Sequence, residues 1–179
     1  MTSGLYIAEV VRGAQLGVVN IAKRASFQLG MINIADDVDV SIALMTFARD
    51  SVHPIGWAGN LNYGNAGVKL TSKYAYSILA LTVGTNEMGP KGVGGTVALG
   101  AHIPLPASFD VELEGAVSHI GNDPDGAKSN NASVHPRIIA GYSIAKHLRP
   151  FVGIGARIPF LVDKGSMAVR PEVVGGVQF

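Results

Sequence analysis

The chain has no cysteine, so it holds neither a disulfide nor a thiolate metal site. Its 14 Lys and Arg are balanced by 13 Asp and Glu. Without a basic excess, nucleic-acid binding has no electrostatic support. The longest uncharged stretch, around Gly92–Phe109, is interrupted by Gly and Pro. It falls short of the roughly 20 consecutive apolar residues of a membrane-spanning helix.

Charge is scarce as well as balanced. Only 15% of the residues are charged, against about 25% in an average soluble domain. The mean hydropathy is +0.30, and 23 glycines argue against a helical bundle. A chain of this kind enters a membrane only as a closed β-barrel, which satisfies its backbone polar groups internally. The first residues lack a basic region followed by an apolar core, so the sequence contains no secretory signal. Either the protein is not exported or this is the mature segment of an exported protein, and the rest of the chain favours the second alternative.

Alternation with a period of two dominates the second half and predicts strands. In Phe109–His119, the three carboxylates Asp110, Glu112 and Glu114 share one face, and the other face carries none. Such runs are about as long as transmembrane strands, which need about 9–11 residues, whereas ordinary strands average about 5–6. The more polar faces are rich in Gly, Ala and Ser, which suits the crowded interior of a narrow barrel.

The predicted strands number 11, although bacterial barrels have even counts. Either Leu5–Ala22 is one strand, giving ten, or Ile55–Thr71 is two, giving twelve. Short turns alternate with long loops at Thr85–Lys91, Gly121–Ser133 and Leu161–Gly165, which places the C-terminus on the short-turn side. The predicted strands are Leu5–Val11, Ala14–Ala22, Phe27–Ala35, Val40–Ala48, Ile55–Thr71, Tyr74–Thr85, Val93–Pro104, Phe109–His119, Val134–Ala145, Arg149–Phe160 and Val169–Phe179.

The first third of the chain is repetitive. Residues 15–22 read QLGVVNIA, residues 28–35 read QLGMINIA, and residues 41–48 read SIALMTFA. The copies start 13 residues apart, since 28 − 15 = 13 and 41 − 28 = 13. Such a repeat indicates one structural unit stacked several times, either a strand plus a turn of a sheet or one rung of a β-solenoid.

Two features resemble known families. The copies within 13–48 are similar to the GVQLGLVNVA-type repeats of bacterial surface-repeat proteins. The stretch Asn60–Phe179 resembles the C-terminal part of an outer-membrane β-barrel, and its ending VVGGVQF is similar to the terminal signal that such barrels present to the insertion machinery. This resemblance implies that the terminal aromatic, Phe179, is an assembly signal.

The faces of the alternating strands give two predicted sets of residues. A charge on the lipid side costs about 2–4 kcal/mol near the midplane, so the charged faces should point inward. The predicted barrel-lining residues are Lys69, Asp110, Glu112, Glu114, Arg137, Arg157, Arg170 and Glu172. The predicted outward band includes Leu99, Ile103, Val111, Leu113, Ile154, Ile158, Val173 and Phe179.

Three patterns invite a chemical interpretation. The carboxylates of Asp110, Glu112 and Glu114 could hold Ca²⁺ or act on a glycoside, but a polar barrel lining explains them better. The pair Ser118-His119 could belong to a lipid-hydrolysing barrel, but adjacent strand residues point to opposite faces. The glycines of GPKGVGG (89–95) lack the order of a phosphate-binding loop. We therefore predict no catalytic residue, no cofactor and no metal site.

The sequence thus predicts an all-β fold, a single antiparallel transmembrane β-barrel of 10–12 strands over residues 1–179. Residues 13–48 would supply repeat-derived strands and residues 55–179 the regular ones. We expect an integral protein of the bacterial outer membrane with a structural, anchoring or narrow-pore role. Its expected partners are outer-membrane lipid or lipopolysaccharide, the barrel-assembly machinery and other envelope proteins. The alternatives are a soluble β-solenoid or sandwich adhesin and an outer-membrane lipid-modifying enzyme.

Overall fold

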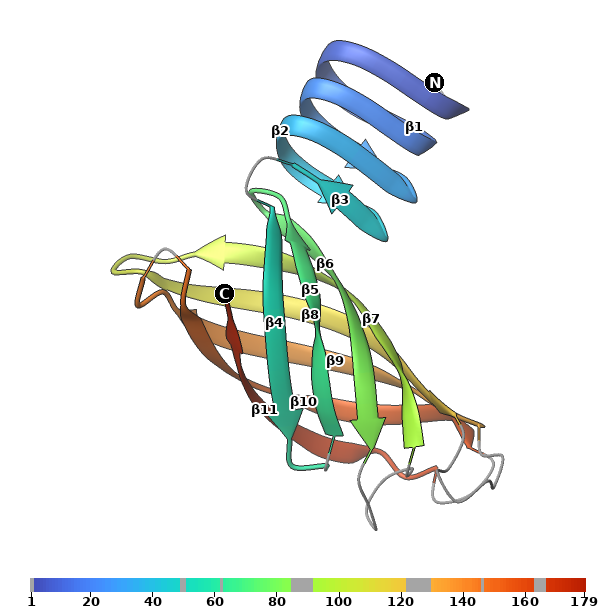
Figure 1. Cartoon of the computed structure of the whole chain (residues 1–179), viewed down its shortest axis with the longest axis vertical. Coiled ribbons are helices and arrows are strands. Elements are labelled where there is room, and N and C mark those ends of the chain that lie inside the picture. The colour runs from blue at the N-terminus through green and yellow to red at the C-terminus, as the bar shows by residue number, and fades with distance from the viewer. Residues whose placement is uncertain are drawn as a thin grey trace.

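The computed structural model describes residues 2–48, 51–61, 63–84, 92–121, 130–145, 147–162 and 167–179, and within them the chain is all-β (Figure 1). Eleven strands form two sheets: a closed barrel and a smaller three-stranded sheet at one of its ends. Among these residues, no helix is long and apolar enough to cross a membrane. The predicted loop Thr85–Lys91 and most of Gly121–Ser133 lie outside the described residues.

Eight strands close into the barrel in the order β10-β11-β4-β5-β6-β7-β8-β9. All neighbours are antiparallel, and the pairing of β11 with β4 closes the ring, so the barrel has no free edge. The strands are β4 (Val52–Gly59), β5 (Tyr63–Thr71), β6 (Ala75–Gly84), β7 (Gly92–Pro104), β8 (Phe109–Gly121), β9 (Asn130–Tyr142), β10 (Arg149–Val162) and β11 (Arg170–Gln178).

The antiparallel barrel confirms the predicted fold class, but the strand number of 10–12 is wrong, since the barrel has eight strands. The segment Ile55–Thr71 is indeed two strands, because the chain turns back at Asn60 and Leu61. The repeats of 13–48, however, contribute no strand to the barrel. They form their own sheet from β1 (Thr2–Leu29), β2 (Ile32–Ile42) and β3 (Met45–Phe47).

The repeat sheet is parallel, and its register equals the sequence repeat. Val19 pairs with Ile32, and Ile32 pairs with Met45, each partner lying 13 residues further along. Consecutive copies therefore stack directly on one another, as rungs of a solenoid do. The solenoid interpretation of the repeat holds, because a strand-and-turn meander would pair its copies antiparallel.

Buried polar side chains at equivalent positions of successive copies form hydrogen-bonded ladders through the repeat sheet. The Asn20 Nδ2 atom donates a 2.8 Å hydrogen bond to Oδ1 of Asn33, and Gln28 Nε2 donates one of 2.8 Å to Oε1 of Gln15. All four amides are essentially inaccessible to solvent. A Cβ on Gly30 would lie 2.5 Å from the Gly17 carbonyl oxygen and 2.6 Å from Asn20 Nδ2, so a side chain at position 30 would displace the ladder.

The repeat sheet rests on the end of the barrel where the turn Ser72–Tyr74 lies (Figure 1). The Tyr74 amide donates to the Asp39 carbonyl over 3.1 Å, and Ser77 Oγ donates to the Leu44 carbonyl over 3.3 Å. The Lys73 ammonium binds the Asp39 carboxylate at 3.3 Å, and this side-chain hydrogen bond raises the pKa of Lys73 above its usual value. The C-terminus lies at the same end, where the Phe179 amide donates to the Pro54 carbonyl.

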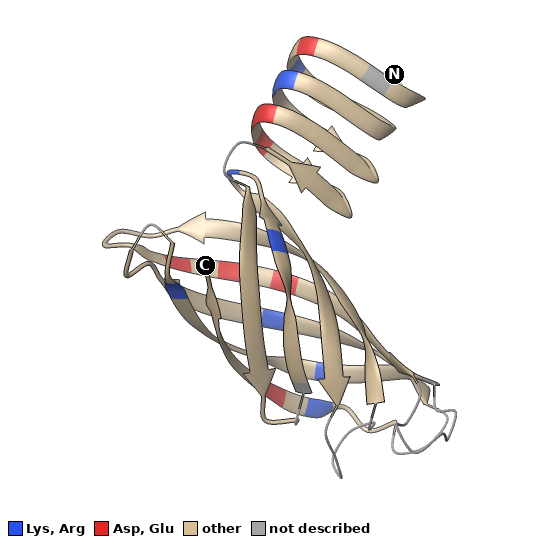
Figure 2. Cartoon of the chain, viewed as in Figure 1, with Lys and Arg blue, Asp and Glu red and all other residues tan. Residues whose placement is uncertain are grey.

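Figure 2 shows where the charged residues lie along the ribbon of the barrel, and their side chains are withdrawn from its outer surface. Its described strands contain nine charged residues; eight are buried, Arg170 is half-buried, and none is exposed. The outside is apolar, with Leu81 at 70% and Ile154 at 64% exposure. Of the predicted outward band, Val111 is half-buried and the other seven residues are exposed.

Candidate functional site

The barrel interior is the candidate site, because it collects the charged side chains that the alternation of β8 predicts. Asp110, Glu112 and Glu114 project inward and are at most 6% exposed. Seven of the eight predicted lining residues are buried on the inner face of the barrel wall: Lys69, Asp110, Glu112, Glu114, Arg137, Arg157 and Glu172. Arg170, at the start of β11, is only half-buried.

At the end nearer the repeat sheet, two cations neutralise two carboxylates. The Lys69 ammonium binds Glu112, and the Arg149 guanidinium binds Asp110 with both Nε and Nη2, the Nε bond being 2.7 Å long. Arg149 Nη2 also lies 3.1 Å from Glu112 Oε1. Because all four groups are nearly inaccessible to solvent, each charge depends on its partner for the stabilisation that water would otherwise give.

A second cluster lies deeper in the barrel around Arg137. Its guanidinium donates to Glu114 over 3.0 Å and to Glu172 with Nε over 2.9 Å and Nη2 over 3.0 Å. The Tyr76 hydroxyl donates to Glu114 over 3.2 Å, and the Lys69 ammonium lies 3.9 Å from the centre of the Tyr76 ring. The two clusters are therefore linked through Tyr76 and Lys69.

Inward-facing glycines make room for this network. A Cβ on Gly100 would overlap the ring of Tyr76, its cross-strand partner. A Cβ on Gly141 would overlap the guanidinium of Arg149. The small residues on the inward faces of the strands thus leave the space that the large charged and aromatic side chains of neighbouring strands occupy.

The charges of the described barrel interior are balanced, and its middle is closely packed. Its eight buried charged residues comprise four cations (Lys69, Arg137, Arg149 and Arg157) and four anions (Asp110, Glu112, Glu114 and Glu172). An apolar cluster that includes Ile55, Trp57 and Phe151 packs beside them. The cavity between the two sets measures about 10 Å³, the order of a single water.

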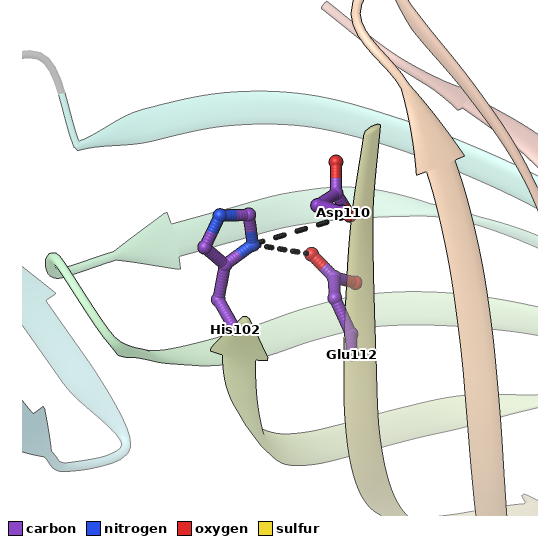
Figure 3. Close-up of side chains that lie close together, drawn as sticks. All are labelled: His102, Asp110 and Glu112. Carbon is purple, nitrogen blue, oxygen red and sulfur yellow. Dashed lines mark hydrogen bonds and ion pairs between the residues drawn. The ribbon is translucent and has the colours of Figure 1, made fainter. Parts of the chain in front are cut away.

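His102 lies at the mouth of the barrel beside two of these carboxylates (Figure 3). Its Nδ1 is 3.4 Å from Glu112 Oε1 and 4.0 Å from Asp110 Oδ1, next to a cavity of about 230 Å³. The ligand types suit a divalent cation. However, Lys69 and Arg149 already bind the same carboxylates, so a metal ion would have to displace them. The arrangement favours a neutral ion-pair cluster over a metal site.

Nearer the other end, the fold assembles a serine, a histidine and a glutamate. Ser118 Oγ lies 2.7 Å from His135 Nε2, and His135 Nδ1 lies 3.1 Å from Glu172 Oε2. All three side chains are buried. The order matches a nucleophile, a base and an orienting acid. His119, which the sequence pairs with Ser118, takes no part in this cluster. It points outward and is exposed, because adjacent residues of a strand lie on opposite faces.

The sequence interpretation missed Arg149, His135 and Tyr76. Arg149 has the same parity as Arg157 on β10, and His135 has that of Arg137 on β9, so alternation alone could have identified both. Tyr76 carried no such signal, because β6 alternates among apolar side chains on both faces. The predicted assembly residue Phe179 is exposed at the end of β11, and its carbonyl lies 3.2 Å from His53 Nδ1.

Comparisons of the chain with models of protein families, with curated proteins and with solved structures give no match.

Proposed function

We propose that the chain is an integral barrel of the bacterial outer membrane that anchors its repeat sheet to the bilayer. One observation carries this proposal: in the described barrel strands eight of the nine charged side chains are buried and none is exposed, and the outer surface is apolar. In water, a barrel would be expected to carry its charged side chains on the outside. Acyl chains favour the observed arrangement, since Arg or Lys on the lipid face costs about 2–4 kcal/mol at the midplane.

Aromatic side chains at one rim support the same placement. Phe109 and Tyr142 are both exposed, and their ring centres are 4.7 Å apart at the ends of β8 and β9. Tyr74 and Phe179 are exposed at the same end of the barrel. Outer-membrane barrels carry aromatic girdles where the hydrocarbon meets the headgroups.

The closely packed middle of the interior favours anchoring over conduction. A pore would need a continuous aqueous path, whereas Arg137, Glu114 and Glu172 bind one another across the lumen beside a cavity of only about 10 Å³. Barrels of about eight strands are commonly packed with side chains. We therefore assign the interior network to holding the barrel shut and stable.

The connections suggest which way the barrel faces. The short turns after β5, β7 and β9, the C-terminus and the repeat sheet share one end, whereas the turn at Asn60 and Leu61 lies at the other end with the long connections. In bacterial barrels the short turns are periplasmic, so the repeat sheet would lie on the periplasmic side. In this position it would present a platform to envelope partners, and the long connections would face the exterior.

Membrane fractionation of a charge-insertion pair tests this proposal. We expect Ile154→Arg, on the outward face of β10, to abolish membrane assembly and heat-modifiable gel migration. The matched control, His119→Arg, replaces an exposed residue near the end of β8 and should assemble normally. A wild-type chain that is monomeric and soluble without detergent would contradict the proposal and favour the soluble adhesin.

A second candidate, ester hydrolysis, rests on the Ser118–His135–Glu172 arrangement. The structural role fits these residues better, because Arg137 binds both carboxylate oxygens of Glu172 and the three side chains are buried. A fluorophosphonate probe separates the two roles. Covalent labelling of the folded wild type that is lost in Ser118→Ala would establish a nucleophile, whereas a structural serine stays unlabelled.

A further inference from the structure

The repeat sheet has two chemically distinct edges, which follow from the position of each residue within its 13-residue coil. Each coil is taken to begin at Gln15 or at a residue 13 positions before or after it. The described residues of the sheet include seven charged side chains, and all of them lie in the second half of their coil: Glu9, Arg12, Lys23, Arg24, Asp36, Asp37 and Asp39. In Figure 2 these charges gather along one edge of the coils, and the opposite edge is free of them.

The opposite edge is apolar and exposed. Leu5, Val18, Met31 and Leu44 form a column at intervals of 13 residues, with exposures of 57%, 51%, 54% and 41%. Ile34 and Phe47 form a second exposed column at the same interval. One large exposed apolar residue, Val10, lies on the charged half of its coil instead. Repetition at every rung makes the edge a continuous surface, larger than the scattered apolar residues of an ordinary protein surface.

A shallow, open hollow of about 680 Å³ marks this edge, and it is lined by Gly4, Leu16, Gly17, Val18, Leu29, Gly30 and Met31. These residues recur at intervals of 13 along the stacked strands, so the hollow follows the stacking direction. Extended hydrocarbon chains fit a surface of this shape and chemistry.

The apolar edge continues the outer surface of the barrel. The carbonyl of Leu44 accepts a hydrogen bond from Ser77, a residue whose place in the alternation of β6 directs it outward. The neighbouring Tyr74, which binds the Asp39 carbonyl, belongs to the aromatic rim. The repeat sheet therefore stands at the level of the barrel rim, where the proposed function places the headgroup boundary.

We infer that the repeat sheet lies in the membrane interface, with its apolar edge among the acyl chains of the adjoining leaflet and its charged edge in water. This inference rests on the proposed function. An interfacial amphipathic helix is held in the same way, by apolar area on one side and solvated charge on the other. The repeat is then a second membrane contact of the chain, built from stacked strands.

Site-directed spin labelling tests the inference, and the absence of cysteine makes every single-cysteine variant unambiguous. Nitroxides are placed by Met31→Cys on the apolar edge, Lys23→Cys on the charged edge and Ile154→Cys on the outer wall of the barrel. The full chain is reconstituted in vesicles of phosphatidylethanolamine and phosphatidylglycerol. Collision rates are measured with oxygen, which concentrates in lipid, and with a water-soluble nickel chelate.

The expected result is an oxygen-to-nickel collision ratio at Met31 that equals that at Ile154 and exceeds that at Lys23 several-fold. Nickel access at Met31 with lipid exposure at Ile154 would overturn the inference and leave the barrel proposal intact. Shielding of Met31 from both reagents, with spin–spin broadening, would show a second copy on this edge and also overturn it. Nickel access at Ile154 would overturn the membrane proposal itself.

Discussion

Lys69 and Glu112 are 43 residues apart in the chain and form an ion pair inside the barrel, each side chain at most 3% exposed. β5 and β8 carry them inward from non-neighbouring strands, so their contact spans the lumen. The pair illustrates the arrangement of the barrel: charges are removed from the outer surface and paired with each other in the interior.

Breaking this pair from one side should be costly. We expect Lys69→Met to lower the free energy of unfolding by about 3–5 kcal/mol, because Glu112 stays buried with fewer partners. The double variant Lys69→Met, Glu112→Gln should cost less than the sum of the two single changes. Urea titrations of the reconstituted barrel, followed by gel mobility, measure both. Additive effects would contradict a direct pair.

The glycine at position 141 is predicted to be required by Arg149. A Cβ there overlaps the guanidinium, so Gly141→Ala should displace Arg149 from Asp110 and destabilise the barrel by about 1.5–3 kcal/mol, the range for hydrogen bonds to charged groups. Gly115→Ala is the matched control, since nothing lies within 4 Å of its added Cβ. Equal thermal stability of the two variants would refute the packing argument.

The asparagine ladder should set the stability of the repeat sheet. Asn33→Ala removes the partner of Asn20 and of Ser41 and should cost about 1–3 kcal/mol per buried group left unsatisfied. The exposed control Lys23→Ala should change stability by less than about 0.5 kcal/mol. Amide hydrogen exchange in β1 and β2 reports the effect locally. Unchanged protection in Asn33→Ala would count against the ladder.

The interior network should block conduction. In planar bilayers the wild-type barrel is expected to give no steady ion current, because Arg137 ties Glu114 to Glu172 across the lumen. The variant Arg137→Ala, Glu172→Ala should open current steps, whereas the control Ile154→Val on the outer face should give no current. Steady single-channel conductance of the wild type would argue for the narrow-pore role.

The last residue is predicted to matter for assembly rather than for stability. Deletion of Phe179 should reduce insertion by the assembly machinery in cells, and Phe179→Tyr should preserve it, because the aromatic end is retained. Fractionation with quantification of the folded, heat-modifiable form gives the comparison. Normal assembly of the deleted chain would remove the terminal-signal hypothesis.

Much of the barrel could be predicted from the sequence because side chains alternate across a strand with a period of two. The predicted strands Val93–Pro104, Phe109–His119 and Arg149–Phe160 differ from β7, β8 and β10 by at most a few residues at their ends. The same alternation identified seven lining residues that prove buried. It could not pair them, because alternation gives the face of a side chain and says nothing of what stands across the lumen.

The sequence by itself determined the all-β class, the alternation that separates charged from apolar faces and the 13-residue period of the repeat. Only the tertiary structure decided that the repeats stack in parallel outside a barrel of eight strands, and that Ser118 meets His135 rather than its neighbour His119. The physical reason is that periodicity is local to one strand. Pairing partners, closure and lumen contacts depend on which distant strands become neighbours, and a period of two or of 13 does not specify that.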